Sequence, residues 1–177
     1  MTDFLKKDDI PTTDRIAKCG YLLASFFIPL IILVLSLIAL HITPFGSHTL
    51  IVSDGSCSYL PMLSFLGRLF KGEEGILYSF KNGLGGNNLS SLAWGQINPL
   101  FGLAAFGDLE TYPDIYTWIS VLNFAVSGVF MMLLLGNVNG WRFSNLLFST
   151  TYALIGFNVT NHFQIIFFVG VGCRFLQ

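Results

Sequence analysis

The chain has few charged residues and no cluster of basic ones. Charged residues make up only 11% of its 177 residues, whereas an average soluble domain has about 25%. The nine Lys and Arg are scattered and the formal net charge is −1, so we expect no nucleic acid partner. Because 53% of the residues are hydrophobic, the composition predicts an all-α integral membrane protein.

Cysteine and histidine are too few and too scattered for a disulfide framework or a common zinc site. No C-x-x-C pair and no H-E-x-x-H motif occurs, and these are the spacings that metal sites usually require. We interpret the cysteines as small apolar fillers and the histidines as helix-end or packing residues. These residues are Cys19, Cys57, Cys173, His41, His48 and His162.

Long apolar runs divide the chain. Residues 20–42 carry no charge and match the roughly 20 residues of a membrane-spanning helix. A cleaved signal peptide fits less well, because its apolar region is about 7–15 residues long and ends in an A-x-A-like site. Residues 115–136 form a second predicted span, residues 137–142 a cytoplasmic turn, and residues 143–177 a third and a truncated fourth apolar segment. Because the chain ends within that pattern, we expect an N-terminal fragment of a longer protein, cut by a premature stop or frameshift.

The distribution of cations predicts how the first span is oriented. The polar tail, residues 1–19, carries Lys6, Lys7, Arg15 and Lys18, whereas the first cation after the span is Arg68. Positive charges close to a span favour the cytoplasmic side. We therefore expect a multi-pass protein with its N-terminus in the cytoplasm and residues 43–114 outside.

The outside segment has two recognisable parts. Residues 58–70 have apolar residues at spacings of three and four, with Ser64, Arg68 and Lys71 on the other side, which predicts an amphipathic helix. It lies in the membrane interface or, alternatively, packs on a small core. A loop rich in Gly and Asn follows, and residues 89–106 are apolar but interrupted by Gln96 and Pro99, which favours a re-entrant or interfacial element.

Asp54 is the leading candidate for chemistry. It follows the first span closely, and an acid there is far cheaper at the water boundary than inside lipid. The alternative is that Asp54 caps the amphipathic helix. Asp108 and Glu110 form a weaker, second acidic site, for which a solvated loop is the alternative.

Six short motifs together resemble the YfhO family of bacterial multi-spanning membrane proteins. The family usually has Gln before the tyrosine of the second motif, where this chain has Ser58. The motifs are Pro44-Phe45-Gly46, Leu50-Ile51-Val52-Ser53-Asp54 with Tyr59, Tyr78-Ser79-Phe80, Gly83-Leu84-Gly85-Gly86-Asn87, Asn98-Pro99-Leu100 and Tyr152-Ala153-Leu154-Ile155-Gly156.

The resemblance implies the N-terminal part of a C-type glycosyltransferase-like fold. Members of the family are associated with moving a sugar from a polyprenyl-phosphate carrier to cell-envelope polymers such as lipoteichoic acid, on the outer face of the bacterial cell membrane. In C-type transferases an acid on the first outside loop is catalytic or binds a metal ion, and Asp54 occupies that place. A fragment of 177 residues is expected to be inactive alone, because most of the cavity for a long lipid donor is missing.

Sugar transfer to a hydroxyl needs a base and a means of holding the departing phosphate. Asp54 can be the base, orient the acceptor, or coordinate a divalent cation. Arg68 and Lys71 could hold the phosphate, or could simply reach to lipid headgroups. The remaining donor-binding candidates are Tyr59 and the turn of Gly85, Gly86 and Asn87, whose backbone could cradle a phosphate or form an ordinary turn.

Two other functional classes fit the same hydrophobicity. A transporter component would be expected to carry polar or ionisable groups within its spans, and the first span contains no Asp, Glu, Lys or Arg. A non-catalytic accessory protein would not need the acid. Loss of sugar transfer on replacing Asp54 would separate an enzyme from both.

Overall fold

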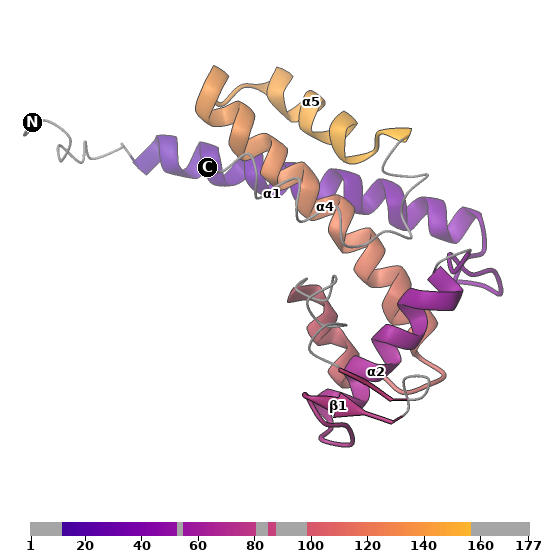
Figure 1. The fold of residues 1–177 in the computed structure, drawn as a ribbon. Helices are drawn as coiled ribbons and strands as arrows, with labels where there is room; N and C mark the ends of the chain where they lie inside the picture. Colours follow the sequence, from indigo (N-terminus) through magenta and orange to yellow (C-terminus); the bar gives the residue numbers. More distant parts are fainter. Residues whose placement is uncertain (1–11, 53–54, 81–84, 88–98, 157–177) are drawn as a thin grey trace, which may run out of the picture.

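The computed structural model describes residues 12–52, 55–80, 85–87 and 99–156. Figure 1 shows α1 (Thr12–Ala39), α4 (Tyr112–Asn139) and α5 (Phe143–Ala153) together in one part of the molecule, with α2 (Leu60–Phe70) near the start of α4. The architecture is mostly helical, as expected for an all-α membrane protein. Its elements are α1 (Thr12–Ala39), the π-helical turn η1 (Gly55–Tyr59), α2 (Leu60–Phe70), β1 (Tyr78–Ser79), β2 (Gly86–Asn87), the 3-10 helix η2 (Pro99–Phe106), α4 (Tyr112–Asn139) and α5 (Phe143–Ala153).

Two of the helices are long and apolar enough to cross a membrane. They comprise Arg15–Ala39, with 25 residues, and Tyr112–Asn139, with 28 residues. Both exceed the roughly 20 residues that a crossing needs. Helix α1 begins before the predicted span of residues 20–42 and ends three residues earlier, whereas α4 extends beyond residues 115–136 at both ends.

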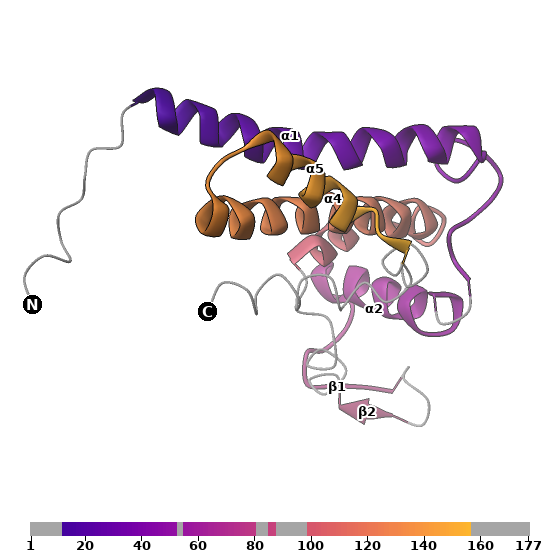
Figure 2. The same ribbon diagram turned by 90° about the horizontal axis from the view of Figure 1, so that it is seen from above.

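Helices α1 and α4 pack side by side and run antiparallel. A methyl group added to Gly128 of α4 would lie 2.7 Å from the carbonyl oxygen of Ser25 and 3.6 Å from Cγ of Pro29, both in α1. Towards the start of α4, the Thr117 hydroxyl lies 3.4 Å from that of Thr43, just after α1. Later residues of α1 therefore face earlier residues of α4, and the end of α1 lies near the start of α4 (Figure 2).

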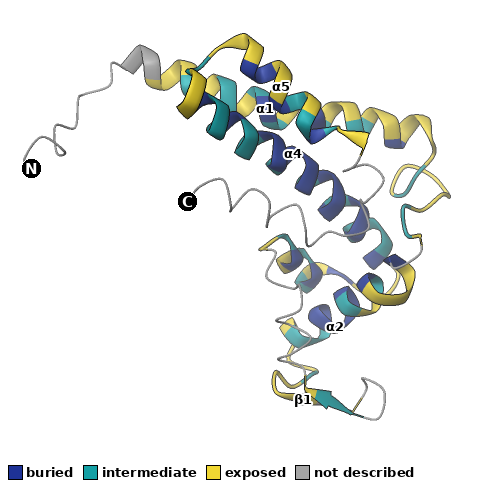
Figure 3. Ribbon diagram, turned by 45° about the horizontal axis from the view of Figure 1, so that its top comes forward, coloured by how far each residue is buried: buried dark blue, intermediate teal, exposed yellow. Residues whose placement is uncertain are grey.

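The two long helices differ in how much of their surface other elements cover. Within the most apolar 18 residues, 56% of α4 is buried but only 17% of α1. Figure 3 shows the same contrast between a buried α4 and a largely exposed α1. Exposed apolar side chains along α1 are compatible with lipid and unusual for a surface in water. They include Leu23, Phe27, Ile31, Leu35 and Ile38.

Helix α5 turns back along α4 and is short. Gly140, at the turn, has a φ of 82°, which glycine adopts readily. The Asn145 side-chain amide donates hydrogen bonds to the carbonyl oxygens of Gly140 at 2.6 Å and Leu135 at 3.3 Å. With 11 residues, α5 is about 16 Å long, roughly half of the hydrocarbon core of a bilayer. Helix α5 falls within the predicted third segment, and the whole of the predicted fourth segment lies in residues 157–177, outside the described residues.

The predicted amphipathic helix is present as α2, but it is buried over a wider face than its pattern indicated. Ser64, expected on the polar side, is only 8% exposed, and Phe65 is 4% exposed. The reason is that α2 packs on both η2 and the start of α4. We call the resulting apolar cluster the loop core: Tyr59, Leu63, Leu66, Phe101, Ala104, Tyr112, Tyr116 and Ile119.

Helix α2 ends two residues before a glycine. Gly72 has a φ of 75°, its amide donates to the carbonyl of Leu69, and the Glu73 amide donates to the carbonyl of Arg68 at 2.9 Å. This pair of bonds is the Schellman arrangement, which satisfies carbonyl groups left free at a helix end. The chain then leaves α2 towards the antiparallel pair β1–β2.

Candidate functional site

Asp54, the predicted catalytic acid, lies outside the described residues. The described residues on either side of the pair 53–54 are joined, because the Gly55 amide donates a 2.9 Å hydrogen bond to the Val52 carbonyl. Gly55 is buried and begins η1. Turns of π-helix are rare and occur frequently at functional sites, which draws attention to this part of the chain.

The buried residue Tyr116 of α4 lies against Gly55. Its side chain is 1% exposed, and a methyl group added to Gly55 would lie 3.1 Å from the Tyr116 hydroxyl oxygen. Tyr59, at the end of η1, is 7% exposed in the same loop core. Tyr59 was predicted to contact the donor; in the described structure its ring is packed in the loop core.

Tyr116 was missed by sequence reasoning. It lies in the second predicted span, where Thr117, Ser120 and Asn123 are also polar, so a single tyrosine does not stand out from its neighbours. Its partner Gly55 is far away along the chain, and only the fold brings the two together. A tyrosine hydroxyl within an apolar run was the one available signal, since a buried tyrosine usually needs a polar partner.

The segment that follows α1 is anchored on the first turns of α4. Besides the Thr43–Thr117 contact, the rings of Phe45 and Trp118 meet edge to face, with their centroids 6.2 Å apart. Thr117 also donates a 3.1 Å hydrogen bond to the Pro113 carbonyl of its own helix. The chain leading towards Asp54 therefore begins beside the start of α4.

Arg68, a predicted phosphate-binding residue, is paired within α2 and its C-terminal turn. Its Nε lies 3.3 Å from Oε1 of Glu74, and its Nη1 donates a 2.9 Å hydrogen bond to the Ser64 hydroxyl. The Glu74 side chain is only 6% exposed. Because Arg68 neutralises a buried carboxylate, binding a phosphate would require it to leave that partner.

Lys71, the second predicted phosphate-binding residue, connects the end of α2 to the turn before α4. Its ammonium group donates to the Asp108 carboxylate at 2.6 Å and to the Gly107 carbonyl at 2.7 Å. The hydrogen bond with Asp108 raises the pKa of Lys71 above its ordinary value, so the group stays charged at physiological pH. Lys71 and Asp108 thus satisfy each other.

The weaker acidic candidates Asp108 and Glu110 belong to the turn that starts α4. The Asp108 amide donates to the Thr111 hydroxyl at 2.8 Å, and its carbonyl accepts from the Thr111 and Tyr112 amides. Glu110 is exposed. This geometry gives Asp108 a structural role, while a role for either residue in binding stays a prediction.

The glycine-rich turn contributes to a β-hairpin. Gly86 pairs with Ser79, and Asn87 pairs with Tyr78. Gly85 has a φ of 105°, and a methyl group there would collide with the Tyr78 hydroxyl. Gly86 and Asn87 thus belong to a strand of this hairpin, and phosphate binding by their backbone stays a prediction. Residues 81–84 of the same motif lie outside the described residues.

Among the residues that the structure describes, no three His, Cys, Asp or Glu side chains come together as a metal site; Asp54, the expected ligand, is outside this set.

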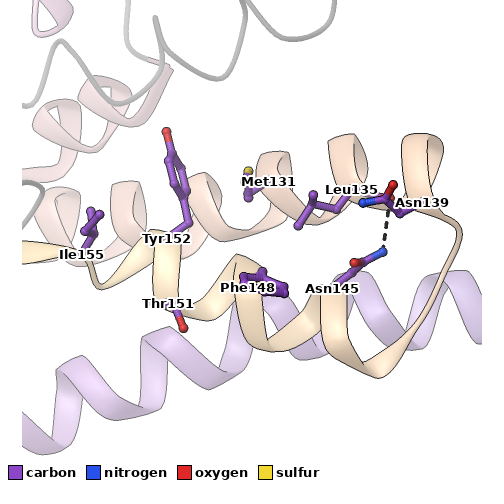
Figure 4. A pocket seen from close by; sticks show the side chains of 8 residues that line it. All are labelled: Met131, Leu135, Asn139, Asn145, Phe148, Thr151, Tyr152 and Ile155. Atoms are coloured by element: carbon purple, nitrogen blue, oxygen red, sulfur yellow. Dashed lines mark hydrogen bonds between the residues drawn. The ribbon is translucent and has the colours of Figure 1, made fainter.

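A groove of about 460 Å³ lies between α4 and α5 (Figure 4). Its lining contains no Asp, Glu, Lys or Arg: Met131, Leu135, Asn139, Asn145, Phe148, Thr151, Tyr152 and Ile155.

The long apolar helices and the exposed apolar surface of α1 define a helical membrane protein. A family model described as bacterial membrane protein YfhO matches residues 25–171. The chain therefore belongs to the YfhO family of bacterial membrane proteins, which confirms the resemblance of its motifs. No curated protein and no solved structure matches the chain.

Proposed function

We propose that this chain is part of a glycosyltransferase that moves a sugar from a polyprenyl-phosphate donor to a cell-envelope polymer such as lipoteichoic acid. In this proposal α1 and α4 both cross the membrane, the N-terminus is cytoplasmic, and the loop core lies on the outer face. The observation that carries the proposal is the buried contact of Gly55 with Tyr116. Gly55 directly follows Asp54, and Tyr116 lies near the start of α4, which is close to the end of α1.

The proposed chemistry assigns a proton transfer to Asp54. As the acceptor hydroxyl attacks the anomeric carbon, the carboxylate takes its proton. The new bond joins the acceptor oxygen to the sugar, and the bond from the sugar to the phosphate oxygen breaks. Polyprenyl phosphate departs with the electron pair, and nearby cations or backbone amides stabilise its charge. A divalent cation held by Asp54 is the alternative role for this acid.

The surroundings of the proposed site suit a lipid-linked donor. The lipid tail of such a donor can lie along exposed apolar helix surface, of which α1 has a great deal, while its phosphate needs polar groups at the membrane boundary. Arg68 and Lys71 lie on the loop side of the molecule and carry positive charge, but each has an acidic partner. Donor binding therefore predicts that Glu74 or Asp108 is exchanged for the phosphate.

The test replaces Asp54 by Asn in the chromosomal gene. We expect loss of sugar from the envelope polymer, measured by mass spectrometry of purified lipoteichoic acid, with an unchanged amount of protein in the membrane. Loss of a catalytic base costs about 10²–10⁴-fold in rate. Asp114→Asn, in the first turn of α4, is the control and should retain the sugar.

Two results would contradict the proposal. Unchanged sugar content in the Asp54→Asn strain would refute the catalytic assignment and favour a non-catalytic accessory role. If a strain that lacks the gene carries the same polymer sugars as the wild-type strain, glycosyl transfer itself is refuted.

A further inference from the structure

We propose that the groove between α4 and α5 holds one acyl chain of an anionic phospholipid, whose phosphate group lies beside Arg142. The groove adjoins the later half of α4, whereas the loop core takes its α4 residues from the start of that helix. The bound phospholipid is therefore distinct from the donor of the proposed transfer, and its binding does not depend on whether the protein transfers a sugar.

The groove has the size and the length of one acyl chain. Its volume is about 460 Å³, which at about 30 Å³ for a water-sized group leaves room for about 15 such groups, close to the number of methylene groups in a common fatty-acyl chain. Helix α5, which forms one wall, has 11 residues and is about 16 Å long. One leaflet supplies about 15 Å of the hydrocarbon core, so a single chain fits along the groove within one leaflet.

Amide side chains gather at one end of this groove, and most of the remaining lining is apolar. Asn139 and Asn145 lie at the end that adjoins the turn between the two helices (Figure 4). The Asn145 amide donates to the carbonyl oxygens of Gly140 and Leu135, which fixes the shape of the turn. Asn139 is exposed, and its amide can donate to a phosphate oxygen. A headgroup and a hydrocarbon chain therefore have separate places.

Arg142 supplies positive charge at the polar end of the groove. It is exposed, and its carbonyl oxygen accepts a 3.1 Å hydrogen bond from the Asn145 backbone amide, so its backbone borders the groove. It is the only Asp, Glu, Lys or Arg among residues 115–156. Neither ion pair within the described parts of the chain involves it. A phosphate group would give Arg142 the partner that Arg68 and Lys71 already have.

Trp141 and the length of α4 place the same turn at the membrane boundary. The Trp141 ring packs on Gly136 of α4, where an added methyl group would lie 2.9 Å from Cε2 of the ring. Tryptophan is enriched at the level of lipid headgroups. Helix α4, with 28 residues, is about 42 Å long and exceeds the roughly 30 Å hydrocarbon core, so its last turn reaches the headgroups. Basic groups between transmembrane helices at this level bind anionic headgroups.

Photoactivatable lipids test the site in nanodiscs that contain the full chain and equal amounts of phosphatidylglycerol and phosphatidylcholine. One of the two lipids at a time carries a diazirine in its acyl chain, and the cross-linked residues are quantified by mass spectrometry. At Leu135 and Phe148 of the groove we expect the ratio of phosphatidylglycerol to phosphatidylcholine cross-links to be about fivefold higher than on residues 23–38 of α1, the effect of one basic residue near a headgroup. The exposed apolar side chains of α1 sample bulk lipid.

Two variants separate the headgroup from the chain. Arg142→Gln should lower the ratio in the groove to the value on α1. Lys18→Gln, which removes a charge from the start of α1 at the same end of the antiparallel pair, is the control and should leave the ratio unchanged. Leu135→Trp should fill the groove and reduce cross-linking of Phe148 by both lipids. The comparison of the groove with α1 in the wild type requires no variant to fold.

Four results would overturn the proposal. Equal ratios in the groove and on α1 would refute selection of an anionic headgroup, and a high ratio that persists in Arg142→Gln would refute the role of that residue. Absence of cross-links at Leu135 and Phe148 with either lipid would mean that protein covers the groove. Undiminished cross-linking of Phe148 in Leu135→Trp would mean that the chain lies outside it.

Discussion

Arg68 in α2 and Lys71 directly after its end lie three residues apart, but their acidic partners differ in how far they are buried. The partner of Arg68 is Glu74, whose side chain is 6% exposed, whereas the partner of Lys71 is Asp108, whose side chain is 80% exposed. Removing a partner from a buried charge leaves that charge without compensation, and removing it from an exposed charge leaves the charge to water. The two positions should therefore differ in their effect on stability, although their sequence context is similar.

We predict that Arg68→Met destabilises the protein by about 1–3 kcal/mol, the cost of a buried polar group deprived of a partner. Lys71→Met should leave the stability close to that of the wild type, since water replaces the lost partner of Asp108. Thermal unfolding in detergent micelles, followed by circular dichroism, measures both. Equal melting temperatures for the two variants would show that Glu74 does not depend on Arg68.

At the scale of elements, α2 is placed by a close approach to two other elements. A methyl group added to Gly67 would collide with the Tyr112 hydroxyl of α4 and lie 2.9 Å from the Ala104 carbonyl oxygen of η2. The absence of a side chain at Gly67 thus lets α2 sit against both. Lys71 adds a polar tie to Asp108 in the turn before α4.

Gly67→Ala tests this approach. Within a helix, alanine is favoured over glycine by about 1 kcal/mol, but the collision with a backbone carbonyl and a packed ring costs about 1–3 kcal/mol. We expect net destabilisation in chemical denaturation of the purified protein. Gly102→Ala, at a glycine with no atom within 4 Å of an added methyl group, should not be destabilised; a Gly67→Ala protein as stable as wild type would mean that α2 can move away without loss.

The sequence predicted α2 as an element better than it predicted its surroundings. Spacings of three and four identified the helix and its apolar side, including Leu63 and Leu66. They could not identify the burial of Ser64 and Phe65, because that burial comes from η2 and α4, which approach α2 from directions set by the fold. The contact between Gly55 and Tyr116 was missed for the same reason.

For the whole molecule, α4 is the central element. It packs against α1, against α5 in its later half, and against α2 and η2 near its start. Gly128 marks a point where three helices meet, since an added methyl group would lie 2.7 Å from the Ser25 carbonyl oxygen in α1 and 3.4 Å from Cβ of Ala153 in α5. Small residues allow such close approaches between helices in membranes.

We predict that Gly128→Val loosens this three-helix contact and destabilises the protein by about 1–3 kcal/mol, because the added methyl groups overlap the backbone of α1. Unfolding by sodium dodecyl sulfate, followed by tryptophan fluorescence, measures the change. Gly20→Val is the control, since an added methyl group there has no atom within 4 Å. Identical unfolding curves for Gly128→Val and wild type would contradict the packing.

The long uncharged runs predicted α1 and α4 from composition alone, because a chain that must satisfy its backbone in lipid has few structural options. How these helices pair depends on small residues such as Gly128 and Ser25, whose partners the local pattern does not indicate. The site is less predictable still. Asp54 follows from its position in the motif, whereas its neighbourhood depends on η1 and on the first turns of α4.

The composition of the loop core also determines when this part of the protein can fold during synthesis. Three of its members, Tyr112, Tyr116 and Ile119, belong to α4, so the core cannot close until the ribosome has passed them. Ile119 comes 60 residues after Tyr59, the first member of the loop core, which is roughly 3–12 s at ordinary rates of synthesis. During this interval the apolar side chains of α2 and η2 have no core to join. Synthesis of α4 is therefore the step that allows α2 and η2 to pack into the loop core.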